Sequence, residues 1–345
     1  MQANETSRRS FLRQTAAGAA AAALAPQVLS QADEPAKGAP AVMGVGQHKY
    51  EWVDNWAKLP QGKTFGNTHA IQEDAQGRIF VHHTGSESIH VFDADGNLLK
   101  SFGKQWEGAA HGMLLRKEGD TEFLYLAPTS LHKIYKTTLD GEVILEIRYP
   151  KEAGVYDDET KYMPTNIAVA ANGDIYVADG YGKSFIHQYS AKGDYIRTWG
   201  GVGTDPGKMT CPHGIWIDTR SGTEEIVVAD RANVRLQYFS LEGQHLRFVK
   251  DDLLYPCHFD QRGDDLLIPD LHGRVTIFDK ENKLVCHLGE NPGVEKEQGY
   301  PDLPADKRLP GKFISPHGAI WDRAGNIFVG EWVPNGRVTK LKRLV

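Results

Sequence analysis

Short runs of β-branched and aromatic residues recur along the chain, with turn residues between them. Apolar and polar positions that alternate over such short runs predict β-strands rather than helices. In each repeat, a first apolar stretch leads through a turn such as AQGR, ANGD or RAGN into a second run. The second runs are RIFVHH, DIYVADG, EEIVVADR, DLLIPD and NIFVGEW, at residues 78–83, 174–180, 224–231, 265–270 and 326–332. This pattern predicts an all-β protein.

A third and a fourth run complete each repeat. Third runs such as SIHVFDADG and RLQYFSLEG end in the Asp, Gly and Asn residues of tight hairpin turns, and weaker fourth runs such as YIRTWG follow them. The unit recurs six times at intervals of roughly forty to sixty residues, the range in which fixed periods indicate propellers or solenoids. Four antiparallel strands in each of six units predict a six-bladed β-propeller.

The last repeat contains three runs only, and the chain ends before a fourth. The segment HKYEWVD, His48–Asp54, alternates like a strand and belongs to no other repeat. We expect it to pair beside Val338–Val345 and to cover the edge that an open propeller would expose. The predicted propeller domain therefore spans residues 48–345.

Composition narrows the class of partner. The chain has 345 residues, 40% of them hydrophobic, with 36 glycines and a net charge of −6. An acidic balance without a basic stripe argues against a nucleic-acid surface. We expect a monomer that acts on a small molecule and has no membrane span.

The first residues predict export. The segment TSRRSFLR, Thr6–Arg13, precedes a mildly apolar alanine-rich stretch, and small residues follow at Ser30–Ala32. Paired arginines before such a stretch are typical of a twin-arginine signal, and an ordinary arginine-rich amphipathic start is the alternative. The interpretation assigns residues 1–32 to the signal and residues 33–47 to a flexible linker, and it predicts a periplasmic or secreted protein.

Five histidines occupy the corresponding place in five repeats, and an asparagine occupies it in the sixth. The segments are NTHAI, AAHGM, PTNIAV, CPHGI, YPCHF and SPHGA, which contain His69, His111, Asn166, His213, His258 and His317. In a six-bladed propeller, blades two, four and six lie about 120 degrees apart around the central channel. His111, His213 and His317 hold those positions, and three converging imidazoles are the ligand set of a catalytic zinc ion.

Two alternatives to this metal centre stay open. Each histidine can instead fill its strand motif and donate to a neighbouring carbonyl, and the same tripod also suits Cu, Ni, Fe or Mn. His69 and His258 are candidates for a second site, for contacts that orient the ligands, or, together with Asn166, for hydrogen bonds to substrate.

The three cysteines give a weaker signal. Cys211 and Cys257 each lie next to one of these histidines, whereas Cys286 lies in a fourth run. The offsets of Cys211 and Cys257 from their histidines differ by one residue, which predicts side chains on opposite faces. We therefore expect free thiols rather than a disulfide between them.

The chain resembles the NHL-repeat propellers, and among them the peptidyl-α-hydroxyglycine amidating lyases. The similarity covers nearly the whole chain after the predicted signal and is strongest at Met163–Phe239, in PTNIAV, IYVADGYGKSFIHQYS, CPHGIWID and IVVADRANVRLQYF, and again in SPHGAIWDRAGNIFVGE. The resemblance implies zinc bound by His111, His213 and His317. It also implies a catalytic tyrosine at Tyr181 and an active-site arginine at Arg231. From the residues alone, Tyr181 can be a rim aromatic, and Arg231 can form an ion pair with Asp179 or Glu331.

The chain departs from that family at two places. A second active-site arginine of the family corresponds to Thr84, and an aspartate that helps to hold calcium corresponds to Gly318. The resemblance therefore does not extend to a calcium site or to the family's grip on a substrate carboxylate. His82 and His83 stand where other repeats have small and acidic residues, so we expect His83 to contact substrate in place of the missing arginine. Asp179, Asp230, Asp270 and Glu331 form a repeated acidic position that we assign to turn capping.

The function that these observations predict is an exported metal-dependent lyase, or a related hydrolase, that acts on a small polar substrate at the propeller axis. The alternative is a non-catalytic NHL propeller that binds a protein or glycan. Metal content separates the two, because fold alone does not define function.

Overall fold

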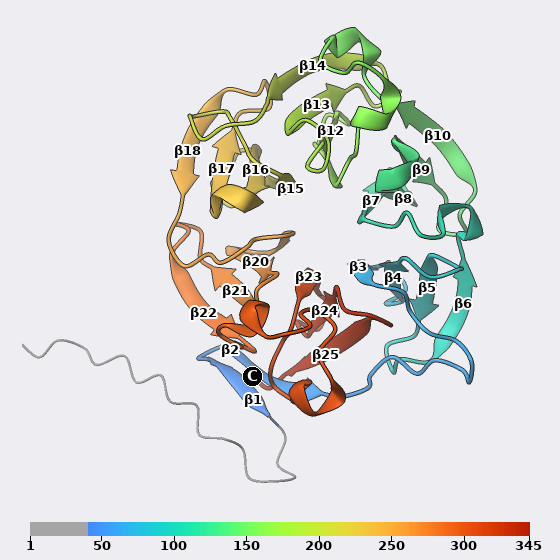
Figure 1. Cartoon of the computed structure of the whole chain (residues 1–345), viewed down its shortest axis with the longest axis vertical. Coiled ribbons are helices and arrows are strands. Elements are labelled where there is room, and N and C mark those ends of the chain that lie inside the picture. Colours follow the sequence, from blue (N-terminus) through green and yellow to red (C-terminus); the bar gives the residue numbers. More distant parts are fainter. Residues whose placement is uncertain (1–40) are drawn as a thin grey trace, which may run out of the picture. The chain divides into compact units, whose positions relative to one another are not determined.

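The protein was analysed as a computed structural model in which residues 41–345 are described. Six sheets surround a central axis, and each sheet presents one inner strand to it (Figure 1). The predicted six-bladed β-propeller is confirmed. The predicted signal, residues 1–32, lies outside the described residues.

Blades one to three are regular four-stranded antiparallel sheets, numbered from the inner strand outward. Their strands are β3 (Thr68–Glu73), β4 (Ile79–His83), β5 (Ile89–Phe92), β6 (Leu98–Phe102), β7 (Gly112–Glu118), β8 (Thr121–Ala127), β9 (Lys133–Thr137), β10 (Val143–Arg148), β11 (Asn166–Val169), β12 (Ile175–Ala178), β13 (Phe185–Tyr189) and β14 (Tyr195–Gly200).

Blades four and five repeat this pattern, and blade six combines strands from both ends of the described chain. The strands are β15 (Pro212–Asp218), β16 (Glu225–Asp230), β17 (Arg235–Phe239), β18 (His245–Val249), β19 (Asp260–Arg262), β20 (Asp265–Asp270), β21 (Arg274–Phe278), β22 (Leu284–Leu288), β23 (Pro316–Trp321), β24 (Ile327–Glu331), β25 (Arg337–Arg343), β2 (His48–Val53) and β1 (Val42–Val45).

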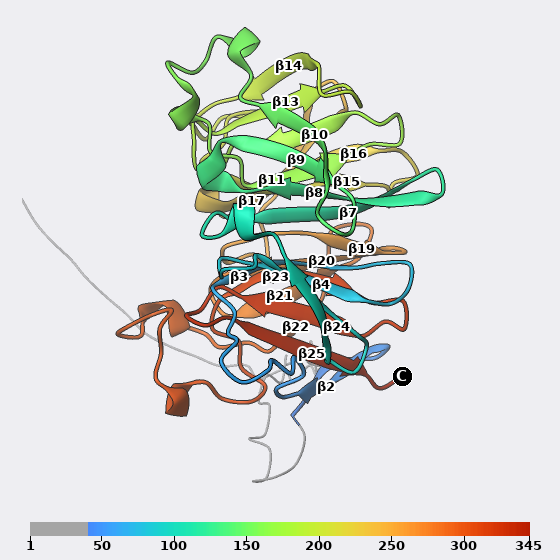
Figure 2. The same ribbon diagram turned by 90° about the vertical axis from the view of Figure 1, so that its right-hand side faces the viewer.

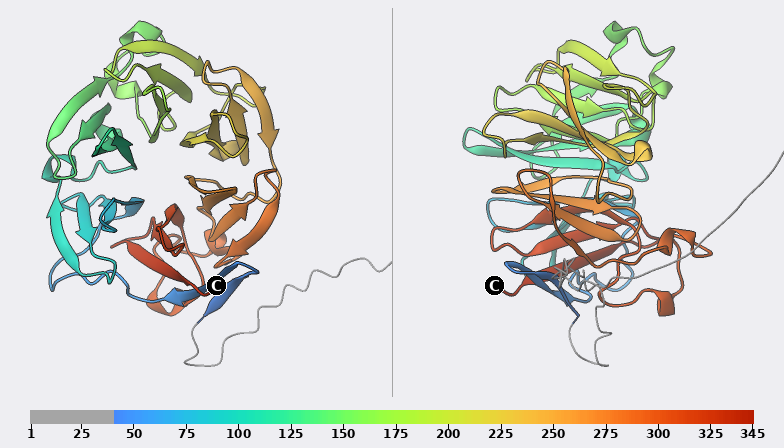
Figure 3. Two further views of the ribbon diagram at one scale, coloured as in Figure 1. Left: turned by 180° about the vertical axis from the view of Figure 1, so that it is seen from behind. Right: turned by 90° about the vertical axis from the view of Figure 1, so that its left-hand side faces the viewer.

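Short 3-10 helices lie in the loops between strands. Viewed from the side, the coiled segments gather along one edge of the propeller (Figure 2), and the opposite views show the same arrangement (Figure 3). Among the described residues, no helix has the length and apolar character that a bilayer span requires. The helices are η1 (Lys104–Trp106), η2 (Thr129–Leu131), η3 (Lys151–Ala153), η4 (Glu159–Lys161), η5 (Arg231–Asn233), η6 (Val294–Lys296) and η7 (Ala305–Lys307).

The apolar core lies between neighbouring blades. Tyr125 and Ile134 of blade two pack with Ile167 and Val177 of blade three in one buried cluster. The second strand of a blade is covered on both faces, and all residues of β12 are buried. Burial on both faces explains why the second runs read as nearly continuous apolar segments in the sequence.

The circle closes as the sequence predicts. β2 pairs antiparallel with β25, with Tyr50 opposite Arg343 and Trp52 opposite Leu341. β1 then pairs with β2 and makes blade six five-stranded. Residues 42–45, which we had assigned to the linker, instead form this edge strand, because the turn after them folds the segment back onto β2.

A buried threonine hydroxyl is among the groups that join the first blade to the last. Thr68 Oγ1 donates to the carbonyl oxygen of Glu331 at 2.6 Å, and the hydroxyl is buried. We expect Thr68→Val, which keeps the side-chain shape, to lower the free energy of unfolding by about 0.5–1.5 kcal/mol, because one buried hydrogen bond is lost while the carbonyl keeps the Val333 N–H as a donor. Urea unfolding measures the change, and Thr64→Val at an exposed position is the control. Equal losses in both variants would contradict the assignment.

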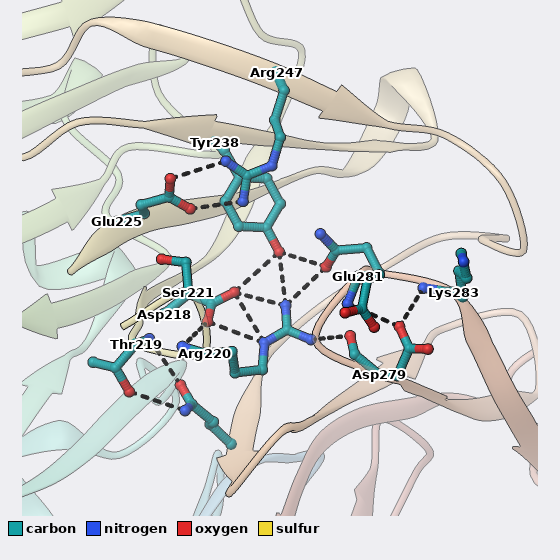
Figure 4. A network of polar contacts seen from close by, with 12 residues as sticks. Asp218, Thr219, Arg220, Ser221, Glu225, Tyr238, Arg247, Asp279, Glu281 and Lys283 are labelled. Atoms are coloured by element: carbon teal, nitrogen blue, oxygen red, sulfur yellow. Dashed lines mark hydrogen bonds and ion pairs between the residues drawn. The ribbon is translucent and has the colours of Figure 1, made fainter. Parts of the chain in front are cut away.

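A buried arginine of blade four, paired with an aspartate of the same blade, also hydrogen-bonds to blade five (Figure 4). Arg220, just after β15, pairs with Asp218 at 2.6 Å, and both side chains are almost fully buried. The same guanidinium donates to the carbonyl oxygen of Asp279 at 2.6 Å and to Asn282 Oδ1 at 2.8 Å. Tyr238 Oη accepts from it at 2.9 Å. The network therefore joins two sheets through one cation.

Candidate metal centre

Bulges in the inner strands turn three of the histidines toward the axis. In β15, Pro212 faces Asp230 and Ile215 faces Val228, so the register shifts across His213. β23 shifts in the same way across His317, and β3 shifts across His69. An extra residue in one strand of a pair re-aims a side chain locally. The bulges thus bring side chains of the inner strands to the centre.

A glycine follows each of the three histidines of the predicted tripod. A Cβ atom at Gly112, Gly214 or Gly318 would lie 2.5–2.6 Å from a carbonyl oxygen of the next blade. Only glycine permits so close an approach. The backbone of this chain therefore requires glycine at position 318. His69 and His258 are followed by Ala70 and Phe259 instead.

Those same carbonyl oxygens orient the three imidazoles. His111 Nδ1 lies 2.6 Å from the Thr165 carbonyl oxygen, and His213 Nδ1 lies 2.8 Å from that of Cys257. His317 Nδ1 lies 2.9 Å from the carbonyl oxygen of His69. Because a carbonyl only accepts, each Nδ1 carries the proton and each neutral ring keeps its lone pair on Nε2. A backbone acceptor on the other ring nitrogen is typical of metal-binding histidines.

The three rings converge. Their centroids lie 4.6–4.9 Å apart, and the Nε2 atoms of His111 and His213 are 3.1 Å apart. Two lone pairs that face each other at this distance repel unless a cation or a proton lies with them. The donor set and its orientation therefore fit a divalent metal ion.

The pKa values also favour neutral ligands. Burial, followed by the neighbouring histidines and Arg231, lowers the pKa of His111 and His213 well below the usual range. Burial lowers the pKa of His317 to about 3. These imidazoles are therefore unprotonated at neutral pH, as metal ligation requires.

The described part of the chain places two further donors in the same cluster. The ligand atoms of His69, His111 and His317 lie within 4.8 Å of one another, and so do those of His213, Cys257 and His317. Both groups contain His317, and neither is the tripod predicted from the sequence. The cluster of possible metal donors thus also includes His69 and Cys257.

Tyr181 lies over this cluster, just after β12. Its hydroxyl oxygen is 3.2 Å from His111 Nε2 and 3.1 Å from His213 Nε2, whereas the residue as a whole is 39% exposed. Burial of the hydroxyl raises the pKa of Tyr181 to about 12, although the nearby Arg231 charge opposes the increase. Asp179 positions the loop by accepting from the backbone N–H groups of Met163 and Lys183. Tyr181 therefore borders the centre rather than the outer rim.

Arg231 does not form the expected ion pair with Asp179 or Glu331. It is 7% exposed and, among the described residues, has no carboxylate within ion-pair distance. Its Nη2 donates to Tyr181 Oη at 3.3 Å, and its guanidinium lies over the rings of Tyr181 and Tyr255. The cation is thus directed at the phenol.

The two cysteines approach the same guanidinium. Arg231 Nη2 lies 3.3 Å from Cys211 Sγ, and Arg231 Nη1 lies 3.8 Å from Cys257 Sγ. The predicted placement on opposite faces is therefore wrong, because Cys211 has a left-handed backbone with φ of 59° that redirects its side chain. Both thiols are free, and so is Cys286.

The repeated acidic position caps loops. Asp230 accepts from the Thr210 N–H, Asp270 from those of Leu254 and Tyr255, and Glu331 from those of Ile314 and Ser315. In blade one, His83 Nδ1 takes this role and accepts from the N–H groups of Gly66 and Gly85.

His83 is fully buried, and its Nε2 lies 2.9 Å from His90 Nδ1. Both ring nitrogens are therefore used inside the blade. The expectation that His83 contacts substrate does not fit this geometry. Thr84, where the resembling family has an arginine, accepts from the Asn67 N–H at 2.9 Å.

Asn166 and His258 do not stand at the same structural position as the three tripod histidines. In blades three and five, the carbonyls that accept from the tripod belong to Thr165 and Cys257, one residue before them. Asn166 Oδ1 accepts from the N–H of Ile167, and His258 is buried with an unpartnered Nδ1 in the described structure. Neither residue belongs to either donor group. Their predicted contact with substrate stays a prediction.

A signal in the sequence distinguishes the tripod from the other two histidines. The dipeptide His-Gly occurs at His111, His213 and His317, whereas His-Ala and His-Phe occur at His69 and His258. The glycine indicates that the backbone lies close to the next blade. A carbonyl oxygen of that blade accepts from the imidazole and fixes its orientation. Sequence reasoning missed Cys257 as a donor because it treated the neighbouring His258 as the equivalent position.

The fold and the histidine cluster together place this protein in a class, that of six-bladed propellers with polar side chains at the central axis. No protein-family model matches the chain. Its homologues are peptidyl-α-hydroxyglycine amidating lyases and an NHL repeat-containing protein. The chain is 29% identical over 195 residues to peptidyl-glycine α-amidating monooxygenase A of Xenopus laevis, covering 53% of this chain and 20% of the relative.

Two shorter relatives show the same similarity. Peptidyl-α-hydroxyglycine α-amidating lyase 1 of Drosophila melanogaster is 28% identical over 222 residues, covering 59% of this chain and 39% of the relative. Human NHL repeat-containing protein 3 is 25% identical over 194 residues, which cover 53% of this chain and 54% of the relative. The matched segments are thus about half or less of each relative.

Solved structures share the fold. A streptogramin B lyase superposes with a TM-score of 0.59 at 14% identity and covers 85% of this chain and 97% of its own. A gluconolactonase of Xanthomonas campestris also gives a TM-score of 0.59 at 14% identity, with 89% and 96% covered. These solved structures therefore show the same propeller fold.

Proposed function

We propose that this protein is an exported, metal-dependent lyase, or a related hydrolase, that cleaves a small polar substrate at the propeller axis. The observation that carries the proposal is the set of three Nδ1 hydrogen bonds that orient His111, His213 and His317, whose ring centroids lie 4.6–4.9 Å apart, and leave their Nε2 atoms free to bind. Purely structural histidines do not need three lone pairs in one place. Similarity to amidating lyases supports the same reaction class.

The three tripod histidines are the proposed ligands, with zinc as the leading metal. When bound, such an ion supplies Lewis-acid polarisation of a substrate hydroxyl or carbonyl oxygen. The protein contributes ligand orientation through the Thr165, Cys257 and His69 carbonyls. Elemental analysis of protein purified without an affinity tag tests this part, and a metal-free protein of normal stability would favour the non-catalytic binding module.

Tyr181 is the proposed base. A substrate hydroxyl placed between Tyr181 and the tripod can give its proton to the phenolate oxygen while the adjacent C–N or C–O bond breaks. The hydroxyl carbon becomes a carbonyl, and the leaving nitrogen or oxygen takes a proton. Burial raises the pKa of the Tyr181 phenol to about 12, so the phenolate that this step requires depends on the charge of Arg231, 3.3 Å away, together with that of a bound metal ion.

The substrate is proposed to differ from peptidyl-α-hydroxyglycine. The arginine of the resembling family is Thr84 here, and His83 does not replace it. Arg231, which lies 3.3 Å from the Tyr181 hydroxyl, supports contact with a different substrate group. A screen of α-hydroxyglycine derivatives against sugar acids and lactones distinguishes a C–N lyase from a hydrolase.

Replacing Tyr181 with phenylalanine should lower kcat by about 10²–10⁴-fold, the range that a positioned general base contributes. Metal content and thermal unfolding should not change, because the ring still packs. Tyr255→Phe is the matched control, since Tyr255 also lies against Arg231 but has no contact with the tripod Nε2 atoms. Steady-state kinetics on the substrate found by the screen measures the effect. A Tyr181→Phe variant with the control's kcat would remove Tyr181 from the reaction.

A further inference from the structure

Cys257 lies where a sulfur atom can enter the metal centre. Its residue is fully buried at the start of the inner segment of blade five. Its carbonyl oxygen accepts from His213 Nδ1 at 2.8 Å, so backbone and ligand ring are already in contact. Its Sγ lies within 4.8 Å of ligand atoms of both His213 and His317. Modest side-chain adjustment therefore brings it to a metal that those histidines hold.

A buried cation lies beside Cys257, because Arg231 Nη1 is 3.8 Å from its Sγ. Arg231 is a buried cation with no carboxylate partner in residues 41–345, and its Nε also has no hydrogen-bond partner there. A buried charge without compensation is costly. The groups near this guanidinium that can become negative are Tyr181 and the thiols of Cys211 and Cys257. The Cys257 sulfur is therefore near both a buried cation and the histidine donors.

Cys211 provides an internal comparison. Its Sγ contacts the same guanidinium at 3.3 Å, yet it belongs to neither donor group among the described residues. Cys286 lies on β22, the outer strand of blade five. Of the three sulfur atoms, only that of Cys257 combines the cation with the histidine donors.

We propose that Cys257 is a sulfur ligand of the metal centre, alongside the tripod histidines. This inference rests on the metal site of the proposed function. Three imidazoles and one thiolate form a donor set that suits zinc and other transition metals rather than calcium or magnesium. Four protein ligands also fill a tetrahedral site, so substrate must displace the sulfur or add a fifth ligand.

Cobalt substitution tests the proposal without any substrate. Metal-free protein is loaded with Co²⁺, and absorption spectra are recorded for the unmodified protein, Cys257→Ser and Cys211→Ser. We expect an intense near-ultraviolet sulfur-to-cobalt charge-transfer band that disappears in Cys257→Ser and persists in Cys211→Ser. The weaker visible bands should persist in all three. Competition with a chelator should show at least about a tenfold loss of Co²⁺ affinity in Cys257→Ser, since loss of an outer-shell partner alone costs about 10–100-fold.

The outcomes separate this inference from the metal site itself. Visible cobalt bands without a sulfur band in the unmodified protein would overturn ligation by Cys257 and leave the histidine site intact. A sulfur band that survives Cys257→Ser would equally overturn the assignment. If no Co²⁺ binds to correctly folded protein, the metal centre fails and the inference fails with it.

Discussion

His213→Ala should abolish stoichiometric metal binding and, with it, turnover. The variant removes one of the three Nε2 donors and also frees the Cys257 carbonyl from its 2.8 Å hydrogen bond. The loss should exceed the roughly 10–100-fold weakening that follows removal of an outer hydrogen-bond partner alone. Elemental analysis and chelator competition measure metal binding, and kinetics on the identified substrate measure turnover.

His258→Ala is the matched control for that experiment. His258 is also a buried histidine of an inner segment, but it belongs to neither donor group among the described residues. It should keep its metal even if stability falls. Loss of metal from both variants to the same extent would indicate a general effect of removing buried histidines, and it would contradict the tripod.

Asp218→Ala should lower the free energy of unfolding by about 3–5 kcal/mol, the cost of leaving one buried charge without its partner. The stranded group is Arg220, which then keeps only its neutral acceptors, such as the Asp279 carbonyl. The double variant with Arg220→Met should cost less than the sum of the two single changes, because no charge remains buried. Glu87→Ala breaks the exposed Lys63 pair and should cost less than about 1 kcal/mol.

The stabilisation that Asp218 provides should depend on pH, and the pKa of Asp218 decides the direction of that dependence. Burial raises the pKa of Asp218, but the hydrogen bonds and charge of Arg220 outweigh burial and leave it below its ordinary value. An acid with a depressed pKa in the folded state stabilises the protein above its unfolded pKa, about 3.9. Stability is lost as the pH falls through the folded-state value. The gap between the unmodified protein and Asp218→Ala should therefore be constant near neutrality and narrow below about pH 4. A gap that widens in acid would contradict the ion pair.

The sequence was sufficient for the architecture because the strand pattern repeats. Apolar second runs and hairpin turns recur in each blade. The HKYEWVD segment, which belonged to no other repeat, supplied the strand missing from the last blade, and it pairs with β25. Strand β1 escaped prediction, since a four-residue edge strand carries little periodic signal.

The centre was only partly predictable for a geometric reason. Counting from sequence motifs treats His69, His213 and His258 as equivalent, but bulges and register shifts of one residue decide which side chain faces the axis. His83 shows the same limit, because the sequence does not reveal that two backbone N–H groups need an acceptor there. Cys257 depends on contacts between blades four, five and six, which no local pattern encodes.

The mixed origin of blade six has a consequence for assembly. His317 belongs to a sheet that combines β23–β25 with β2, so its ring takes its place only after segments nearly three hundred residues apart have paired. A nascent chain that has formed blades one to five still offers an incomplete ligand set. Metal uptake should therefore follow ring closure, and bound metal would mark molecules in which β2 has already paired with β25.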